Sequence, residues 1–147
     1  MRNYMHNLLS YAKKLKNERY FEEMVKELRR KMKSNEPFVG MSIKTDLPPP
    51  IKSMWIFIVR KDTSPHYHPN SIQHSIVLEG KGKVRIGNTF YSLLPISKSK
   101  EKSWCIIEKN VMHEFFPDGE MILVSFHTCH ANELIEIKKT GEKRKYV

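Results

Sequence analysis

The feature that most constrains the fold is a series of short β-rich runs, separated by close turns, that begins near Ser53. Each run is rich in branched and aromatic residues, which favour extended backbone. The runs are Met54–Val59, Ser75–Leu78, Lys83–Ile86, Thr89–Leu93, Trp104–Ile107, His113–Phe116, Met121–Phe126 and Leu134–Ile137. No helical pattern separates them, so they predict a mostly β chain folded as an antiparallel sandwich or barrel.

Turn residues between these runs support the same architecture. Gly87–Asn88 predicts a hairpin, because both residues tolerate positive φ angles. We expect further turns at Gly80–Lys81–Gly82, Lys109–Asn110 and Pro117–Asp118–Gly119.

The N-terminal region has a different, helical pattern. Apolar residues recur at helical spacing over residues 4–16 and again over 18–33, which predicts one or two amphipathic helices that dock either on the barrel or on a partner subunit. Pro48, Pro49 and Pro50 then forbid both a helix and a central strand. We therefore predict a helical arm at 1–47, a barrel at 48–138 and a basic tail at 139–147.

The net charge of +10 is located at the two ends of the chain. Residues 1–35 carry ten Lys or Arg against four Glu, residues 138–147 carry five against one, and the middle is balanced with eleven of each sign. A nucleic-acid groove across the folded centre is not indicated, because the basic residues there are not interleaved with aromatic ones.

The cysteines and the hydropathy bear on the compartment. Cys105 and Cys129 are the only two cysteines, and their spacing fits neither a disulfide framework nor a zinc ribbon. No stretch approaches the roughly 20 apolar residues that span a bilayer. We expect a cytoplasmic protein without a membrane segment.

Three histidines and a glutamine form the candidate metal site. His66 and His68 are two residues apart, so in an extended chain both imidazoles point to the same side. Gln73 follows after a turn, and His113 begins a later strand. Three imidazoles and one amide oxygen would suit Fe, Mn, Zn or Ni and leave positions for water or substrate.

The spacing of these residues resembles the two sequence motifs of the cupin superfamily. His66-x-His68, then Gln73, then Gly80 is similar to the first motif, and His113 stands in a degraded second motif in which Asn110 replaces a glycine. The resemblance covers about residues 53–128, half of the chain. It implies an antiparallel double-stranded β-helix, the cupin or jelly-roll barrel, with a divalent metal ion on His66, His68, Gln73 and His113. Four departures affect turns and loops: Arg60, Lys102, Glu108 and Pro117.

A fifth departure is chemical, because Gln73 stands where the family usually has a glutamate ligand. Three interpretations stay open: Gln73 binds the metal, it hydrogen-bonds a ligand or a metal-bound water, or the site has lost its metal. If metal is bound, a neutral ligand set leaves the full +2 charge, which favours an anionic, chelating substrate.

Three further residues are candidates for substrate binding. Arg60 could bind a substrate carboxylate at the barrel mouth, or form a surface salt bridge. Tyr91 could line the pocket. His127 shares a strand face with Ser125 and could lie near the metal. No residue stands out as a general base.

The resemblance implies several possible functions, since one fold hosts many activities. The first hypothesis is a metal-dependent enzyme, of the dioxygenase, isomerase or lyase type, acting on a small and anionic molecule. The alternative is a non-catalytic cupin that binds or senses a small ligand, with or without metal. We expect a homodimer in either case.

Overall fold

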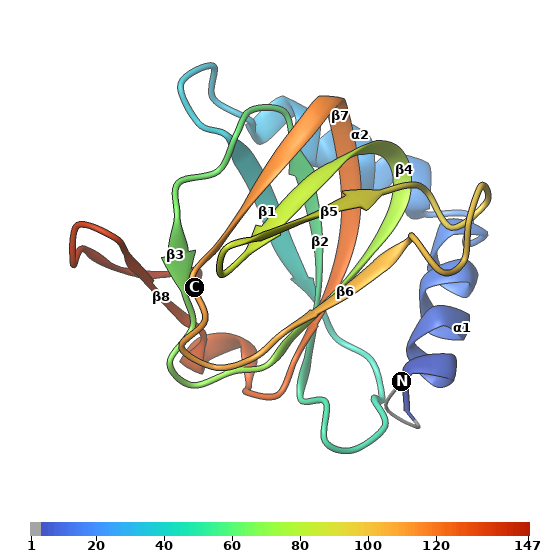
Figure 1. Cartoon of the computed structure of the whole chain (residues 1–147). Coiled ribbons are helices and arrows are strands. Elements are labelled where there is room, and N and C mark those ends of the chain that lie inside the picture. Colours follow the sequence, from blue (N-terminus) through green and yellow to red (C-terminus); the bar gives the residue numbers. More distant parts are fainter. Residues whose placement is uncertain (1–3) are drawn as a thin grey trace.

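Nine strands form one antiparallel sheet that curls into an open barrel (Figure 1) in the computed structural model, which describes residues 4–147. One path through the sheet runs β1–β2–β7–β3–β8–β9, while β4 pairs with β5, β6 and β7. The strands are β1 (Phe38–Ile43), β2 (Ser53–Val59), β3 (His66–Tyr67), β4 (Gln73–Ile86), β5 (Thr89–Leu93), β6 (Trp104–Ile107), β7 (His113–His127), β8 (Ile135–Lys138) and β9 (Lys143–Lys145). A short 3₁₀ turn, η1 (Ala131–Glu133), precedes β8. The predicted mostly β, double-stranded β-helix architecture is confirmed.

Strand β2 and the Met121–His127 half of β7 are buried on both faces and therefore divide the apolar core into two layers. On β2, Met54, Ile56 and Ile58 belong to the layer beneath the helices, while Trp55, Phe57 and Val59 point into the barrel. Alternation along an extended strand produces this division, because successive side chains point to opposite faces. Strand β7 follows the same rule, and its inward face ends in Ser125 and His127.

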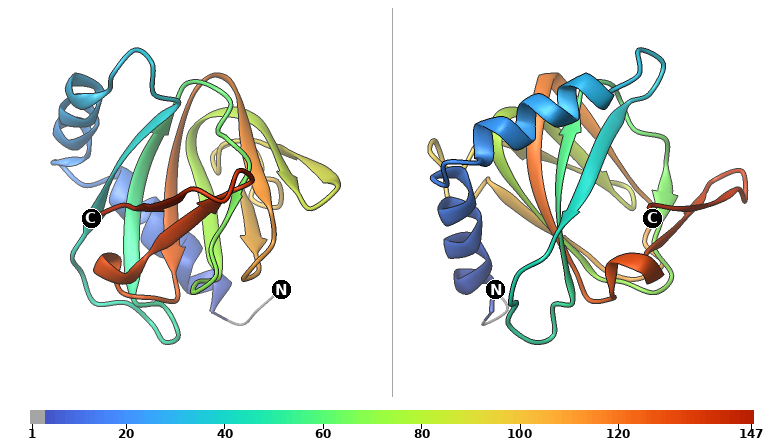
Figure 2. Two further views of the ribbon diagram at one scale, coloured as in Figure 1. Left: turned by 90° about the vertical axis from the view of Figure 1, so that its left-hand side faces the viewer. Right: turned by 180° about the vertical axis from the view of Figure 1, so that it is seen from behind.

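Helices α1 (Met5–Lys16) and α2 (Phe21–Lys31) cover the outer face of the barrel (Figure 2, right). α1 packs against β4, and α2 packs against β1 and β2. Their apolar faces are buried in the outer layer. Beneath α1, the Tyr4 hydroxyl lies 2.7 Å from Nε2 of His74, whose Nδ1 donates to the Phe126 carbonyl at 3.2 Å. Of the two docking sites left open by the sequence, the helices use the barrel.

Two predicted turns lie inside continuous strands. β4 runs through Gly80–Lys81–Gly82 and β7 runs through Pro117–Asp118–Gly119, so the prediction of reversals there is wrong. The register between β4 and β7 shifts twice near Glu79, which bends the pair without ending it. Gly80 has φ +80°, and a Cβ there would lie 2.0 Å from the Glu120 carbonyl oxygen. The glycine serves a bulge and a close backbone approach.

Other turn predictions are confirmed. Gly87 has φ +61° between the paired residues Ile86 and Thr89, as the hairpin requires. Asn110 has φ +65°, the left-handed conformation expected where Asn replaces a glycine.

Both terminal regions contribute to the sheet. The stretch predicted as a helical arm includes β1, which pairs along its whole length with β2. The stretch predicted as a basic tail includes β9, which pairs with β8. The C-terminal segment then crosses the open side of the barrel (Figure 2, left).

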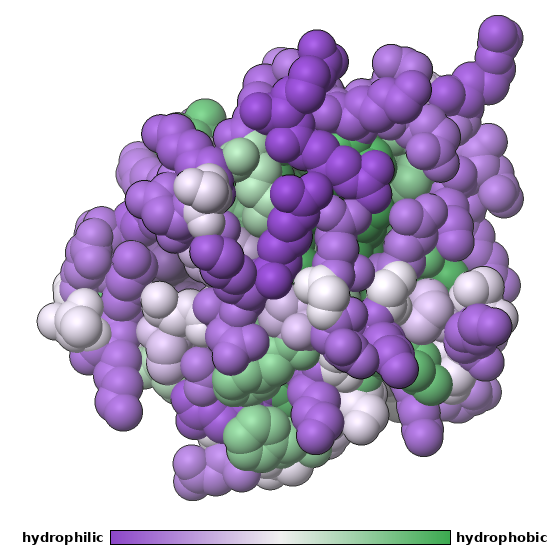
Figure 3. All heavy atoms as spheres, turned by 90° about the horizontal axis from the view of Figure 1, so that it is seen from above, coloured by the Kyte–Doolittle hydropathy of each residue, from purple (hydrophilic) through white to green (hydrophobic). Residues whose placement is uncertain are grey.

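The face of the molecule seen from above carries mostly polar side chains (Figure 3). Seen from above, apolar atoms show only in limited patches between hydrophilic ones (Figure 3). Within residues 4–147, no helix is long and apolar enough to cross a membrane.

Candidate metal centre

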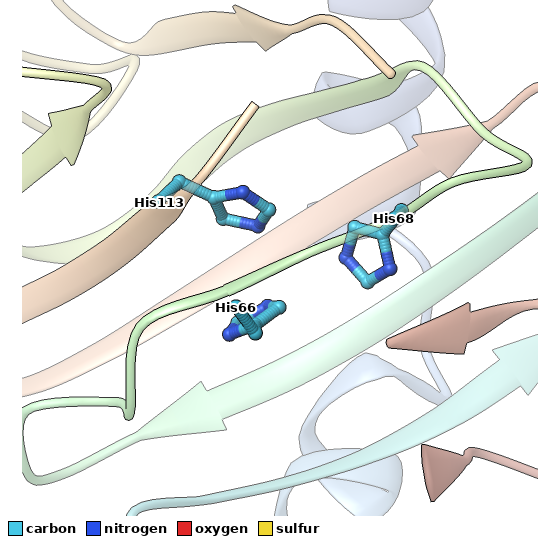
Figure 4. A group of neighbouring side chains, drawn as sticks. All are labelled: His66, His68 and His113. Carbon is cyan, nitrogen blue, oxygen red and sulfur yellow. The ribbon is translucent and has the colours of Figure 1, made fainter. Parts of the chain in front are cut away.

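Three buried histidines converge inside the barrel (Figure 4). His66 on β3 and His113 at the start of β7 are direct partners in the sheet, and His68 follows two residues after His66. One ring nitrogen from each of the three lies within 4.8 Å of those of the other two. The ring centroids are 4.3 Å apart for His66–His113, 5.1 Å for His66–His68 and 5.2 Å for His68–His113.

Each of these rings is oriented by a backbone carbonyl at its Nδ1. The distances are 2.8 Å from His66 to Ser64, 2.8 Å from His68 to Ile135 and 3.0 Å from His113 to Val111. A carbonyl oxygen only accepts, so each Nδ1 carries the proton and each Nε2 keeps its lone pair. Nε2 of His113 is buried and has no hydrogen-bond partner among the described residues. Metal-binding histidines are oriented in the same way.

Burial keeps two of these imidazoles, those of His68 and His113, uncharged. It lowers the pKa of His68 to about 4, with a further contribution from His66. Burial, followed by the neighbouring histidines, also lowers the pKa of His113 well below its ordinary value. Both rings are therefore neutral near pH 7, the form in which imidazole can bind a metal.

Gln73 lies beside the three histidines, on the inward face of β4. Its Nε2 donates to Ser75 Oγ at 2.8 Å, and Ser75 in turn shares a hydrogen bond of 2.7 Å with Ser125. With the amide nitrogen directed to the serines, the amide oxygen is the atom available to the histidines. A hydrogen bond with Gln73 acts to raise the pKa of His68, against the larger effect of burial.

His127 lines the same cavity. It is the partner of Gln73 across the β4–β7 pairing, and its ring centroid lies 5.2 Å from that of His68. Its Nδ1 lies 2.7 Å from Ser71 Oγ, which fixes the ring. Burial, then the neighbouring histidines, lowers the pKa of His127 well below its ordinary value.

The other two residues predicted to bind substrate lie elsewhere. Arg60 is ion-paired with Glu120 at 2.8 Å, outside the cavity, and Glu120 also bonds Arg29 of α2 at 2.6 Å. The salt bridge that the sequence left open for Arg60 is thus the one observed. Tyr91 is 50% exposed on β5 and lines a separate hollow with Phe90 and Trp104.

The histidine cavity is small and mostly apolar. Its volume is about 30 Å³, and its lining residues are Phe38, Phe57, Val59, Thr63, His66, His68, Gln73, Phe115, Leu123, Ser125, His127 and Tyr146. Among the residues described, those that line it include no Asp, Glu, Lys or Arg.

Two residues of this region were missed by the sequence analysis, Tyr146 and Glu136. The Tyr146 hydroxyl donates to Glu136 Oε1 at 2.5 Å, and Glu136 is buried. The alternating pattern of Ile135–Lys138 suggests that the two isoleucines point inward. In the structure Glu136 points inward instead, and the isoleucines are half-buried. A lone aromatic residue at the end of a basic tail was the one available signal for Tyr146.

Comparisons with known proteins identify the fold. No protein-family model and no curated protein sequence matches the chain. Among solved structures, one that is similar is a salicylate 1,2-dioxygenase from Pseudoaminobacter salicylatoxidans with gentisate adducts, at a TM-score of 0.59 and 13% sequence identity. The match covers 74% of this chain and 32% of the dioxygenase chain. A cupin-2 domain from Rhodospirillum rubrum is similar at TM-score 0.53 and 11% identity, covering 78% of this chain and 70% of its own.

A third structure has the same architecture. It is an uncharacterized protein with a double-stranded β-helix domain from Klebsiella pneumoniae, at TM-score 0.50 and 16% identity, covering 65% of this chain and 80% of its own. The chain spans about a third of the length of the dioxygenase. The fold is therefore the double-stranded β-helix of these cupin structures, as the resemblance in the spacing of the histidines implied.

Proposed function

We propose that this cupin holds a divalent metal ion on His66, His68 and His113. The observation that carries the proposal is the arrangement of lone pairs: three Nδ1 atoms are bound to carbonyls, and the opposite nitrogens gather in a buried space. One of them, Nε2 of His113, is buried without a hydrogen-bond partner among the described residues. An unpaired buried acceptor costs about 1–3 kcal/mol, and a metal ion bound there would remove that cost.

The ligand set suits Fe, Mn, Zn or Ni, all of which accept imidazole ligands. Gln73 is placed to be a fourth ligand through its amide oxygen, or to hydrogen-bond what the metal binds. A bound ion would supply Lewis-acid polarisation of a substrate oxygen or, if it were iron, electrons for O₂ chemistry. Because every candidate protein ligand is neutral, the site favours a small anion.

We infer an enzyme of the dioxygenase, isomerase or lyase type acting on such a small molecule. His127 supports this inference, because its neutral ring is fixed beside Gln73 and can hydrogen-bond a bound ligand. The similarity to a salicylate 1,2-dioxygenase gives the reaction classes a precedent in this fold. The alternative, a ligand sensor without turnover, is favoured by the small cavity volume of about 30 Å³.

Compartment and assembly are further proposals. Cys105 and Cys129 are both buried and unpaired, as suits a reducing cytoplasm. A homodimer would need an apolar surface, and the exposed Phe90 and Tyr91 of β5 offer one.

Elemental analysis of protein purified without an affinity tag or chelator tests the metal site. We expect about one metal ion per chain in the native protein and in His130→Ala, which removes an exposed histidine. The double variant His66→Ala/His113→Ala should contain none. If the native protein stays metal-free after incubation with Fe(II), Mn, Ni and Zn, the proposal is wrong.

A further inference from the structure

Two hollows meet at the ring of Tyr146. The inner one is the histidine cavity of about 30 Å³. The outer one, of about 120 Å³, is lined by Glu36, Phe38, Val39, Gly40, Trp55, Phe57, Arg144 and Tyr146. The two share Phe38, Phe57 and Tyr146 as lining residues. The shared residues thus form the partition between the histidines and the outer hollow.

Tyr146 differs from the other two members of this partition, because it lies outside any strand. Phe38 is in β1 and Phe57 is in β2, both within the barrel sheet. Tyr146 follows β9, which pairs with β8 and with no other strand of residues 4–147. The ring could move with the segment after β9 while the barrel strands stayed paired, since segments with few sheet contacts open at low cost.

Side-chain contacts hold the Tyr146 ring in place. It packs edge-on against Trp55 at 5.7 Å, Phe57 at 6.0 Å and His68 at 6.1 Å between centroids. Its hydroxyl donates to Glu136 at 2.5 Å. Burial, together with the Glu136 carboxylate, raises the pKa of Tyr146 well above its ordinary value, so the hydroxyl keeps the proton that it donates.

The volume of the inner cavity limits what can bind while this ring is in place. A water-sized group needs about 10–15 Å³ by this measure, so the cavity of about 30 Å³ takes two or three such groups. An aromatic acid has roughly three times as many heavy atoms as that. Moving the ring aside would join the cavity to the outer hollow and make room for it.

The outer hollow has the chemistry to receive the larger part of such a ligand. Its walls include the aromatic rings of Phe38, Trp55 and Phe57. The Arg144 guanidinium lies 5.0 Å from the Phe38 ring centroid and 5.8 Å from that of Tyr146, so a cation stands beside the partition. Glu36 also lines this hollow, so the aromatic walls suit an aromatic ring and Arg144 supplies the cation for its carboxylate.

We propose that Tyr146 is the specificity-determining residue of the histidine site: its ring admits anions of about three heavy atoms and excludes aromatic acids. The ligand class rests on the proposed metal site. The control of access by Tyr146 does not, and it can be measured on metal-free protein.

The first experiment is histidine modification by diethyl pyrocarbonate in EDTA-treated protein, with each site quantified by peptide mass spectrometry. The exposed His6 and His130 are internal references. In Tyr146→Ala, we expect His66 and His68 to react at least tenfold faster than in the native protein, relative to these references. Tyr146→Leu should give an intermediate rate, and Tyr146→Phe should lie closest to native, because it keeps the ring but loses the hydroxyl bond to Glu136.

Tyr20→Ala is the matched control, since it removes an exposed tyrosine that lines a different hollow. Its modification rates should equal those of the native protein. Circular dichroism melts of each variant identify any loss of fold. Equal rates in native protein and in folded Tyr146→Ala and Tyr146→Leu would overturn the proposal.

The second experiment uses the Co(II)-loaded protein and its visible spectrum. Azide should bind the native protein and Tyr146→Ala within a factor of two, whereas benzoate should bind Tyr146→Ala at least tenfold more tightly. Equal benzoate affinity in the two proteins would overturn the ligand-size role. If Co(II) fails to bind the native protein, the metal site is wrong, and the modification rates still decide the role of Tyr146.

Discussion

His66 and His113 are direct partners across the β3–β7 pairing, and their ring centroids lie 4.3 Å apart. The pairing brings together two residues that are far apart in sequence. Since both Nδ1 atoms are bonded to backbone carbonyls of their own turns, the rings cannot rotate to bond each other without losing those bonds. The sheet thus fixes two adjacent lone pairs before any ligand arrives, which reduces the reorganisation needed for binding.

Metal addition should raise the thermal stability of the native protein and leave His66→Ala unchanged. A ligand present at a hundred times its Kd stabilises the folded state by about 2.7 kcal/mol. For a chain of this size that corresponds to a Tm increase of roughly 5–10 °C. Differential scanning calorimetry with and without Zn²⁺ measures the shift, with His130→Ala as the control. An equal shift in His66→Ala would mean that Zn²⁺ binds elsewhere.

Gln73→Glu should strengthen metal binding and weaken the binding of added anions. A carboxylate next to the ion adds Coulomb attraction. We expect the metal affinity to rise about tenfold, which corresponds to a binding free energy of only about 1.4 kcal/mol. The same charge would repel azide. Competition titration with a chelating dye gives the metal affinity, and Ser125→Ala tests whether disturbing the serine pair alone has an effect. Unchanged metal affinity in Gln73→Glu would mean that Gln73 does not bind the metal and hydrogen-bonds the bound ligand instead.

The site was largely predictable from local spacing. His66 and His68 share a side because they are two residues apart in extended chain, and the Asn110 turn sets the start of the strand that carries His113. Such features depend on short-range geometry. Gln73 and His74 are neighbours in β4, so their side chains face opposite sides: Gln73 faces the cavity and His74 faces the helix α1.

The features that the sequence left open or missed depend on contacts between distant residues. Arg60 is held outside the cavity by Glu120, sixty residues later, and no local pattern indicates that pairing. Tyr146 reaches the histidines only because the β8–β9 hairpin folds back across the barrel, where Glu136 accepts its hydroxyl. Gly80 resembled a turn residue because a bulge and a turn both use positive φ.

Gly80→Ala should destabilise the protein much more than Gly87→Ala. Both glycines have positive φ, +80° and +61°, so both replacements carry backbone strain of about 1–2 kcal/mol. Only at Gly80 would the added Cβ also meet backbone, 2.0 Å from the Glu120 oxygen, whereas nothing lies within 4 Å at Gly87. We expect losses of about 3 kcal/mol or more and about 1 kcal/mol respectively. Urea unfolding measures both, and equal losses would contradict the bulge.

The ion pairs of Glu120 with Arg29 and Arg60 should make part of the stability depend on acid pH. Burial would raise the pKa of Glu120, but hydrogen bonds from the two arginines outweigh it and lower the pKa below the ordinary value of 4.5. A depressed folded-state pKa gives stability that is complete above the unfolded-state pKa and is lost as the pH falls through the folded-state pKa. The loss therefore begins near pH 4.5.

Glu120→Gln should remove this contribution, which we expect to be about 1 kcal/mol because the groups are partly exposed. The free energy of unfolding of the variant should be lower than that of the native protein at pH 7, and the two should converge towards pH 3. Asp118→Asn, which alters an exposed pair with Lys81, is the control and should change the difference little. A native–variant difference that stays constant from pH 7 to pH 3 would mean that Glu120 stabilises the sheet by packing. The ion pairs of Glu120 join β7 to α2 and to the residue after β2, and they must weaken as the carboxylate is protonated.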